Sequence, residues 1–333
     1  MDERKTRAAV IARFRWCGNN RFTILSGRTL IWFWILFNLF VLVMLALDLG
    51  VFNRRAHTVS FREAVIWSAM WIGLALSFAL VLYFWQGRTV SLEFTTGYLI
   101  ELSLSVDNLF VFLVIFRFFR VPSELQHRVL FWGILGALIT RGFFIVAGVG
   151  LIRRFDWIIY IFGALLVWSG IKLMRQGDAE LDPEKNLILK VFRKWMPVTD
   201  DYVGEKFWVR QPGLYATPLV VVLLVVETTD ILFAVDSIPA VLAITLNAFI
   251  VYTSNVFAIM GLRSMYFALA GIMDYFEYLH YGLSAVLIFI GTKMLTSHFF
   301  KIPIHIALAT VIGVLAISVA ASLIFPKKKR TSE

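Results

Sequence analysis

The chain carries one short phrase twice, as ELSLSVDN at residues 101–108 and as DILFAVDS at residues 230–237. In both copies an acidic residue is followed by five residues ending in valine, then by an aspartate and a small polar residue. Glu227 adds a carboxylate three residues before the second copy. Both copies lie within long apolar stretches, and a carboxylate in the core of a bilayer costs roughly 3 kcal/mol. We therefore expect these acids to carry the function of a membrane protein.

The composition is that of a polytopic membrane protein. Of the 333 residues, 59% are hydrophobic and 16% are charged, whereas a soluble domain has about half and about a quarter. Apolar runs of about 20 residues recur along the chain, which is the length that crosses a bilayer as a helix. Much of the net charge of +10 comes from tails and loops, where basic residues set topology and contact lipid headgroups. We expect an all-α polytopic membrane protein whose partner is the lipid bilayer and not nucleic acid.

The apolar runs predict nine transmembrane helices. Their approximate limits are residues 30–52, 62–85, 94–116, 128–151, 155–174, 215–244, 249–270, 276–295 and 303–325. The sixth run is longer than one straight crossing needs. A proline inside a helix lacks an N–H and displaces the carbonyl four residues before it. We therefore expect a bend or break at Pro239, which would free the carbonyl of Val235 beside Asp236.

The spans divide the chain into six segments. They are a basic N-terminal tail (1–29), two leading helices (30–92), a first repeat of three helices (93–174), a polar connection (175–212), a second repeat of three helices (213–295), and a last helix with a basic tail (296–333). We interpret the connection as a solvated linker, with a short amphipathic helix at Leu187–Trp195 on the membrane surface as the alternative. The basic C-terminal tail favours a cytoplasmic C-terminus, although nine spans then place the basic N-terminal tail outside.

The similarity between the two halves extends beyond the acidic phrase. One ungapped register of 18 residues pairs Phe155 with Phe276, Tyr160 with Tyr281, Gly170 with Gly291 and Lys172 with Lys293. Arg141 and Arg263 also correspond, one residue out of that register. A three-helix unit crosses the membrane an odd number of times, so consecutive copies have opposite orientations. The sequence therefore predicts an inverted repeat with a binding site near the middle of the bilayer, where the two repeats meet.

The spacing of the acids restricts how they could share one site. Glu101 and Asp107 are six residues apart, as are Asp230 and Asp236, which on a helix is about 9 Å along the axis and 240° around it. Glu227 and Asp230 are three residues apart and share a helix face. A site that uses all five acids therefore needs a broken helix or contributions from both repeats.

Oxygen ligands surround these acids. Asn108 and Ser237 follow the second acid of each phrase, and hard divalent cations prefer such oxygen donors. Cys17 is the only cysteine, and the histidines lie at or beyond the ends of the spans, so a zinc or copper site is not expected. With Arg141 and Arg263, the five acids sum to −3 if all are ionised. That charge would attract a divalent cation, and protonation of an acid could couple the cation to protons.

The arginines have more than one interpretation. Arg141 and Arg263 could hold the acids in place or complete a gate. In the alternative interpretation, the acids and arginines form structural ion pairs between helices and bind no metal. No metalloprotease, P-loop or dinucleotide-binding motif occurs in the sequence. We therefore expect neither an enzyme nor a permanently bound cofactor.

The phrases ELSLSVDN (101–108) and ETTDILFAVDSIPA (227–240) resemble those of the TerC family of integral membrane proteins, named for tellurite resistance. The resemblance is close to its Alx-like bacterial members and extends over roughly residues 30–325. It implies a role in metal homeostasis, with manganese export as the leading activity, and kinship with the lysine-exporter superfamily of inverted three-helix repeats. The metal-site candidates that the resemblance implies are Glu101, Asp107, Asn108, Glu227, Asp230, Asp236 and Ser237.

The acids and the resemblance together lead us to expect an exporter of a hard divalent cation in a bacterial inner membrane, with Mn²⁺ as the substrate. Coupling to protons stays open. Plant relatives act in thylakoid membrane assembly, so the alternative is a non-transport assembly or stress-response factor connected with tellurite resistance. Kinship with the superfamily adds a third alternative, an exporter of organic cations or amino acids.

Overall fold

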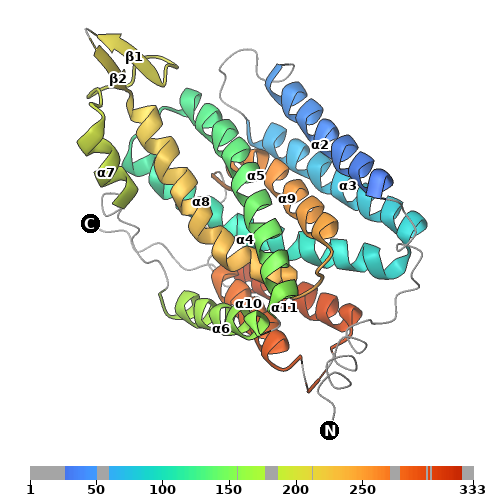
Figure 1. The fold of residues 1–333 in the computed structure, drawn as a ribbon. Helices are drawn as coiled ribbons and strands as arrows, with labels where there is room; N and C mark the ends of the chain where they lie inside the picture. The colour runs from blue at the N-terminus through green and yellow to red at the C-terminus, as the bar shows by residue number, and fades with distance from the viewer. Residues whose placement is uncertain are drawn as a thin grey trace. The chain divides into compact units, whose positions relative to one another are not determined.

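The computed structural model describes residues 27–50, 60–155, 157–176, 187–211, 213–270, 278–297, 299–300 and 302–324, most of them helical (Figure 1). Contacts divide the chain into two compact units, residues 1–54 and 55–333. The described part of the first unit is one apolar helix, α2 (Gly27–Gly50). The predicted basic tail lies almost entirely outside the described residues.

The second unit contains long apolar helices, one short helix and a small hairpin. Its apolar helices are α3 (Phe61–Gln86), α4 (Arg88–Phe118), α5 (Ser123–Arg154), α6 (Ile158–Gln176), α8 (Pro218–Leu242), α9 (Ala248–Ala270), α10 (Leu279–Leu295) and α11 (Ile304–Ile324). Across the described residues, seven helices are long and apolar enough to cross a membrane, while α10 and residues 32–46 of α2 form shorter apolar helices. Each predicted span coincides with one of these helices, which confirms the prediction of an all-α polytopic membrane protein.

Helix α8 does not break at Pro239, where the sequence predicted a bend or a break. It runs as one helix from Pro218 to Leu242 with Pro239 inside it. Only three helical residues follow the proline, and the N–H of Ala243, just past the end of the helix, bonds the Pro239 carbonyl at 2.9 Å. Because the missing N–H falls in the last turn, its cost is limited and the helix continues to its end. The start of the predicted sixth span is not helical either, since Ala216 ends a β-strand.

A tight glycine turn joins α3 to α4. Gly87 has φ +92°, a left-handed conformation that glycine adopts without a steric penalty. Its N–H bonds the carbonyls of Leu82 and Tyr83 at 3.2 and 3.1 Å, and α4 begins at the next residue, Arg88. The turn therefore ends one helix and starts the next without a loop, so that α3 packs beside α4.

Helices α5 and α8 pack side by side and run in the same direction. Gly133 lies against Val226, and Gly148 lies against Leu242, so residue numbers rise together along both helices. A Cβ at position 148 would come within 2.9 Å of a Leu242 methyl carbon. The glycines therefore allow the two helices to approach closely at two points along their length, one of them at the end of α8.

Helices α4 and α9 form a second parallel pair. Gly97 lies beside Ser254 near one end, and the rings of Phe116 and Tyr266 meet edge to face at 5.4 Å near the other. α3 covers α9 and α4, while α11 packs against α10 and α4. The pairs α4–α9 and α5–α8 are also joined to each other through contacts of α4 with α8 and of α5 with α9.

Helices α6 and α10 pack closely and run antiparallel. A Cβ at Gly170 would lie 2.9 Å from the Ser284 carbonyl oxygen, and a Cβ at Gly163 would lie 3.0 Å from the Gly291 carbonyl oxygen. Residue numbers rise along α6 as they fall along α10. Because the backbones nearly touch, only residues without a side chain fit at Gly170 and Gly291, where a Cβ would lie within 2.9 Å of a backbone atom of the other helix.

The described part of the polar connection, interpreted from the sequence as a solvated linker, contains a helix and a hairpin. Helix α7 (Leu187–Trp195) lies where the alternative predicted a short helix. Strands β1 (Trp208–Gln211) and β2 (Gly213–Ala216) form an antiparallel hairpin. The Tyr202 hydroxyl donates a 2.8 Å hydrogen bond to the Phe119 carbonyl, and Arg128 forms an ion pair with Glu205. These contacts hold the connection onto the turn between α4 and α5.

Candidate functional site

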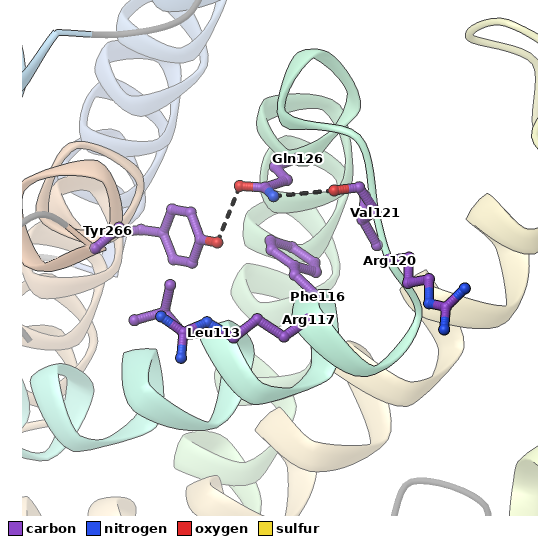
Figure 2. A pocket seen from close by; sticks show the side chains of 8 residues that line it. Leu113, Phe116, Arg117, Arg120, Val121, Gln126 and Tyr266 are labelled. Atoms are coloured by element: carbon purple, nitrogen blue, oxygen red, sulfur yellow. Dashed lines mark hydrogen bonds between the residues drawn. The ribbon is translucent and has the colours of Figure 1, made fainter. Parts of the chain in front are cut away.

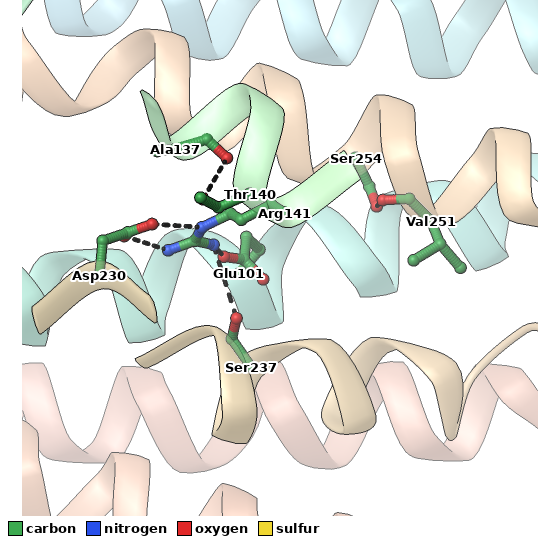
Figure 3. A network of polar contacts seen from close by, with 8 residues as sticks. All are labelled: Glu101, Ala137, Thr140, Arg141, Asp230, Ser237, Val251 and Ser254. Carbon is green, nitrogen blue, oxygen red and sulfur yellow. Dashed lines mark hydrogen bonds and ion pairs between the residues drawn. The ribbon is translucent and has the colours of Figure 1, made fainter. Parts of the chain in front are cut away.

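A buried arginine joins three helices at the centre of the second unit. Arg141 lies on α5 and its side chain is 1% exposed. Its guanidinium forms an ion pair with Glu101 of α4 and donates two hydrogen bonds to Asp230 of α8, from Nε to Oδ2 at 3.2 Å and from Nη2 to Oδ1 at 2.8 Å. A longer contact of 3.5 Å joins Nη1 to the Ser237 hydroxyl (Figure 3). We call Arg141, Glu101, Asp230 and Ser237 the Arg141 group.

The Arg141 group brings together the first acids of the two phrases. Glu101 and Asp230 are 0% and 4% exposed, and buried carboxylates at such positions must be paired because desolvation costs several kcal/mol per ion. The two-pronged contact of Arg141 with Asp230 is the geometry in which a guanidinium binds a carboxylate most strongly. With all three side chains ionised, the group carries a net charge of −1. Sequence reasoning proposed that the arginines pair with the acids, and the structure selects Arg141 as the residue that binds both halves.

Glu227 lies one turn before Asp230 on α8, and its carboxylate faces Gly136 of α5. A Cβ at position 136 would overlap the carboxylate, so the glycine is what leaves room for it. Glu227 is half-buried. It has no hydrogen bond or ion pair to any other side chain among the described residues. The carboxylate is therefore close to the Arg141 group without belonging to it.

Asp236 pairs with helix α6. The Ser169 hydroxyl donates a 2.7 Å hydrogen bond to its Oδ1 atom, and Lys172 lies close enough to interact with its charge. The Lys172 ammonium also lies 5.1 Å from the centre of the Trp168 ring. Sequence reasoning did not place Ser169 or Lys172 in the site, although the repeat had paired Lys172 with Lys293.

The other candidates do not take part in the Arg141 group. Asp107 is half-buried on α4, and Asn108 beside it is 5% exposed. Arg263, the counterpart of Arg141, is half-buried on α9 and lies close enough to His127 for their charges to interact. No three His, Cys, Asp or Glu side chains of the described residues lie close enough together to hold a metal ion. The structure therefore does not assemble the seven candidate metal ligands into one ready-made site.

A second, half-buried polar cluster, which sequence reasoning missed, lies at the junction of α8 and α9. The Thr245 hydroxyl donates a 2.8 Å hydrogen bond to Glu93 of α4. Lys293 of α10 donates to the Ala243 carbonyl at 3.4 Å and lies within electrostatic range of Glu93. Glu93 falls one residue before the predicted third span, which is why it was not counted among the buried acids.

A pocket of about 410 Å³ opens at the end of α4, beside the α4–α5 turn (Figure 2). Tyr266 donates a 3.0 Å hydrogen bond to the side chain of Gln126, which donates in turn to the Val121 carbonyl at 3.1 Å. Arg117 and Arg120 contribute the charge of its lining, and both are exposed. Two guanidinium groups repel cations, so this pocket does not suit the entry of a metal ion.

Comparison with known proteins identifies the family. The sequence pattern described as the integral membrane protein TerC family matches residues 86–330. The chain belongs to the TerC family. The matched stretch runs from the start of α4 beyond the end of α11 and includes the whole Arg141 group and the Asp236–Ser169 pair.

Several bacterial proteins are similar to this TerC chain over nearly their full lengths. An uncharacterized membrane protein of Myxococcus xanthus is 51% identical over 301 residues, covering 90% of the chain and 94% of the relative. A Salmonella typhi protein named "Putative membrane-bound redox modulator Alx" is 46% identical over 295 residues, covering 86% and 92%. An uncharacterized membrane protein of Rickettsia bellii is 40% identical over 292 residues, covering 87% and 97%. No solved structure matches the chain.

Proposed function

We propose that this TerC protein exports a hard divalent cation, with Mn²⁺ as the leading substrate, from a bacterial cell across its inner membrane. The observation that carries the proposal is the convergence of Glu101 and Asp230 on one buried point between α4, α5 and α8. Carboxylates within membrane spans are costly and mark ion pathways more often than chance. Oxygen ligands also suit Mn²⁺ and related hard cations.

The packing of the helices supports an inverted repeat, in which α4, α5 and α6 correspond to α8, α9 and α10. A two-fold axis that exchanges the repeats turns the pair α4–α9 into the pair α8–α5. Both pairs are packed in the structure, and both run parallel. The same axis turns the pair α6–α10 into itself, which requires an antiparallel arrangement, as is observed. Transporters with inverted repeats bind their substrate where the repeats meet.

The sequence register supports the same exchange at the level of single residues. The register that pairs Tyr160 with Tyr281 also pairs Gly163 with Ser284 and Gly170 with Gly291. Exchanging the repeats therefore converts the contact of Gly170 with Ser284 into the contact of Gly291 with Gly163. Both close approaches occur between α6 and α10.

The acids outside the Arg141 group supply further sites for a cation or a proton. Asp107 and Glu227 form no hydrogen bond or ion pair with another side chain in the described part of the chain. Both lie within membrane-spanning helices, on the α4 and α8 segments that also carry Glu101 and Asp230. We assign Asp107 as a station through which the cation passes, exchanging with a proton when it leaves.

A non-transport role is the second candidate, because Arg141 pairs with both Glu101 and Asp230 and neutralises half of their charge, as a structural ion pair would. The printed name of the Salmonella typhi relative also points to redox modulation and not to transport. In that case the protein would act as a membrane assembly or stress-response factor, for example in tellurite resistance, and its acids would hold helices together.

Flux across sealed vesicles separates these functions. The full chain is reconstituted, and uptake of Mn²⁺, Mg²⁺ and Ca²⁺ is followed with and without an imposed pH gradient. We expect Mn²⁺ flux that is lost in Asp107→Asn and in Asp236→Asn and retained in Asp200→Asn, which removes an exposed acid of the connection.

Each other outcome contradicts the proposal in a different way. Metal binding without flux supports the non-transport role. If Asp107→Asn and Asp236→Asn both keep full Mn²⁺ flux, the assignment of these two residues to the transport site is wrong. Inhibition of Mn²⁺ flux by amino acids or organic cations, with those compounds themselves accumulating, supports the third alternative, an exporter of organic cations or amino acids.

A further inference from the structure

The oxygens that bind Arg141 are the oxygens that a transported cation would need. Glu101, Asp230 and Ser237 are three of the seven candidate ligands, and all three contact the guanidinium. Glu101 Oε2 is buried and has no hydrogen-bond partner among the described residues. The arginine therefore leaves part of the coordinating capacity of Glu101 unused, although it occupies the space between the two carboxylates.

A divalent cation and the guanidinium cannot occupy this place together. Glu101 and Asp230 carry a charge of −2 when ionised, which a divalent cation matches. Adding the cation while Arg141 stays would place like charges within contact distance in a site with almost no solvent, where their repulsion is strong. Removing Arg141 without a replacement would leave two buried carboxylates unpaired, which is also strongly unfavourable. Exchange of one cation for the other avoids both costs.

Glu227 provides a second partner for Arg141. It lies three residues before Asp230, which is about 4.5 Å along α8 on the same helix face. Gly136 of α5 leaves the space that the Glu227 carboxylate occupies, five residues before Arg141 on the same helix. A guanidinium that moves one turn along α8 can therefore leave Asp230 and pair with Glu227.

We infer that Arg141 is a tethered cation that competes with the transported ion for Glu101 and Asp230, and that Glu227 receives it when the ion binds. This inference rests on the proposed export of a divalent cation. A purely structural Arg141 explains its contacts with Glu101 and Asp230. It does not explain why a further carboxylate lies one turn away in a space kept open by a glycine.

Mn²⁺ binding to the purified full chain tests the competition. The concentration of free Mn²⁺ is read from its electron paramagnetic resonance signal in detergent solution. We expect Arg141→Met to bind Mn²⁺ about tenfold more tightly than the unmodified chain. Without the arginine the site no longer has to be vacated, so a larger fraction of the protein is competent to bind and the apparent affinity rises. Arg141→Lys keeps the charge but loses the planar fork, and should fall between the two. Arg153→Met removes an exposed arginine of the same helix and should leave the affinity unchanged.

A double-mutant cycle distinguishes the role of Glu227 from that of a direct metal ligand. We expect Glu227→Gln to weaken Mn²⁺ binding in the unmodified chain, because Arg141 then lacks its second partner. In the Arg141→Met background the same change should have no effect. Weakening of equal size in both backgrounds would make Glu227 a ligand and would overturn its role as the receiver of Arg141.

The outcomes also separate this inference from the function on which it rests. If Arg141→Met and Arg141→Lys bind Mn²⁺ no more tightly than the unmodified chain, which itself binds and transports the ion, the competition is refuted and the export proposal stands. If the unmodified chain neither binds nor transports a divalent cation, both fail. Should Arg141→Met not yield folded protein, the comparison of Arg141→Lys with the unmodified chain decides the question alone.

Discussion

Gly291 of α10 lies so close to Gly163 of α6 that a Cβ at Gly291 would be 2.7 Å from the Gly163 carbonyl oxygen. At this distance the two backbones pack with no side chain between them. In membranes, where lipid tails remove much of the hydrophobic driving force, close contact through small residues is a main source of helix association. The α6–α10 pair therefore joins the two halves of the protein through its backbone.

Gly291→Ala should separate α6 from α10 and destabilise the protein. The added methyl group would meet backbone atoms of Gly163 and Val167, and overpacking of this kind costs about 1–3 kcal/mol. The measurement is the thermal unfolding midpoint of the full chain in detergent. Gly150→Ala is the matched control because nothing lies within 4 Å of its added Cβ, and replacing a helical glycine there should stabilise by about 1 kcal/mol. Equal midpoints for the two variants would contradict the close packing.

Asp230→Asn should cost the protein about 3–5 kcal/mol of stability, because it removes a charged partner of the buried Arg141. The loss is measured by denaturant unfolding in detergent and compared with Asp200→Asn, which changes an exposed acid. The double variant Arg141→Met with Asp230→Asn should regain part of the loss, since it removes the buried arginine and leaves Glu101 as the only charged side chain of the Arg141 group, which a proton can neutralise. A double variant that is less stable than Asp230→Asn alone would show that Arg141 stabilises the fold independently of Asp230.

The apolar runs were sufficient to predict the helices, and the duplicated phrase marked the acids within them without indicating which of the acids meet. Apolar length is a local property, and the acids stand out because burial makes them costly. The two arginines, by contrast, correspond in sequence, and only packing between α4, α5 and α8 selects Arg141 for both acids. Whether Arg263 or Arg141 takes that place depends on contacts between distant segments, which spacing along the chain does not encode.

The hydroxyl partners of the acids could not be predicted for a related reason. Ser68, Ser77 and Thr95 all donate to the carbonyl four residues before them, which is the usual fate of a hydroxyl on an apolar helix. Ser169 has the same sequence surroundings but donates to Asp236. The direction of each hydroxyl is set by the neighbouring helix, so the sequence alone cannot separate the two cases.

The hairpin was missed because its stabilising contacts are distant in sequence. The segment 208–216 is short and of mixed polarity, and its strands pair with each other and, through Ala216, with a single bridge to Val198. Tyr202 bonds Phe119 and Arg128 pairs with Glu205 across separations of 83 and 77 residues. An interpretation based on charge and proline content therefore assigned a linker to a segment that tertiary contacts fold.

Ser169→Ala should lower stability by about 1.5–3 kcal/mol, because it removes a hydrogen bond to a charged group. Ser77→Ala is the control, since its hydroxyl bonds only its own helix backbone at an exposed position, and it should change stability by less than about 0.5 kcal/mol. Thermal unfolding of the full chain in detergent reports both. If Ser169→Ala does not lower the stability of a chain that already carries Asp236→Asn, the effect of Ser169 passes through the Asp236 carboxylate. A difference that persists in the Asp236→Asn background would mean that Ser169 acts elsewhere.

The hydrogen bond of Tyr202 should contribute to the stability of the protein in a pH-dependent way. Its hydroxyl donates to the Phe119 carbonyl, and burial raises the pKa of Tyr202 to about 12 from an ordinary value of about 10. The folded state therefore favours the protonated phenol. This contribution is fully present below about pH 10 and is lost as the pH rises through 12.

Tyr202→Phe should accordingly lower stability by about 1 kcal/mol near neutral pH, the net value of one neutral hydrogen bond. Denaturant unfolding of both proteins is measured between pH 7 and pH 11 in detergent, with Tyr160→Phe as a control for an exposed tyrosine on α6. The gap between the unmodified chain and Tyr202→Phe should stay constant up to about pH 10 and narrow above it, because only the unmodified chain loses a donor there. A stability difference that widens with alkaline pH would mean that the folded state prefers the ionised phenolate of Tyr202. That outcome would contradict the hydrogen bond, because a phenolate cannot donate to the Phe119 carbonyl.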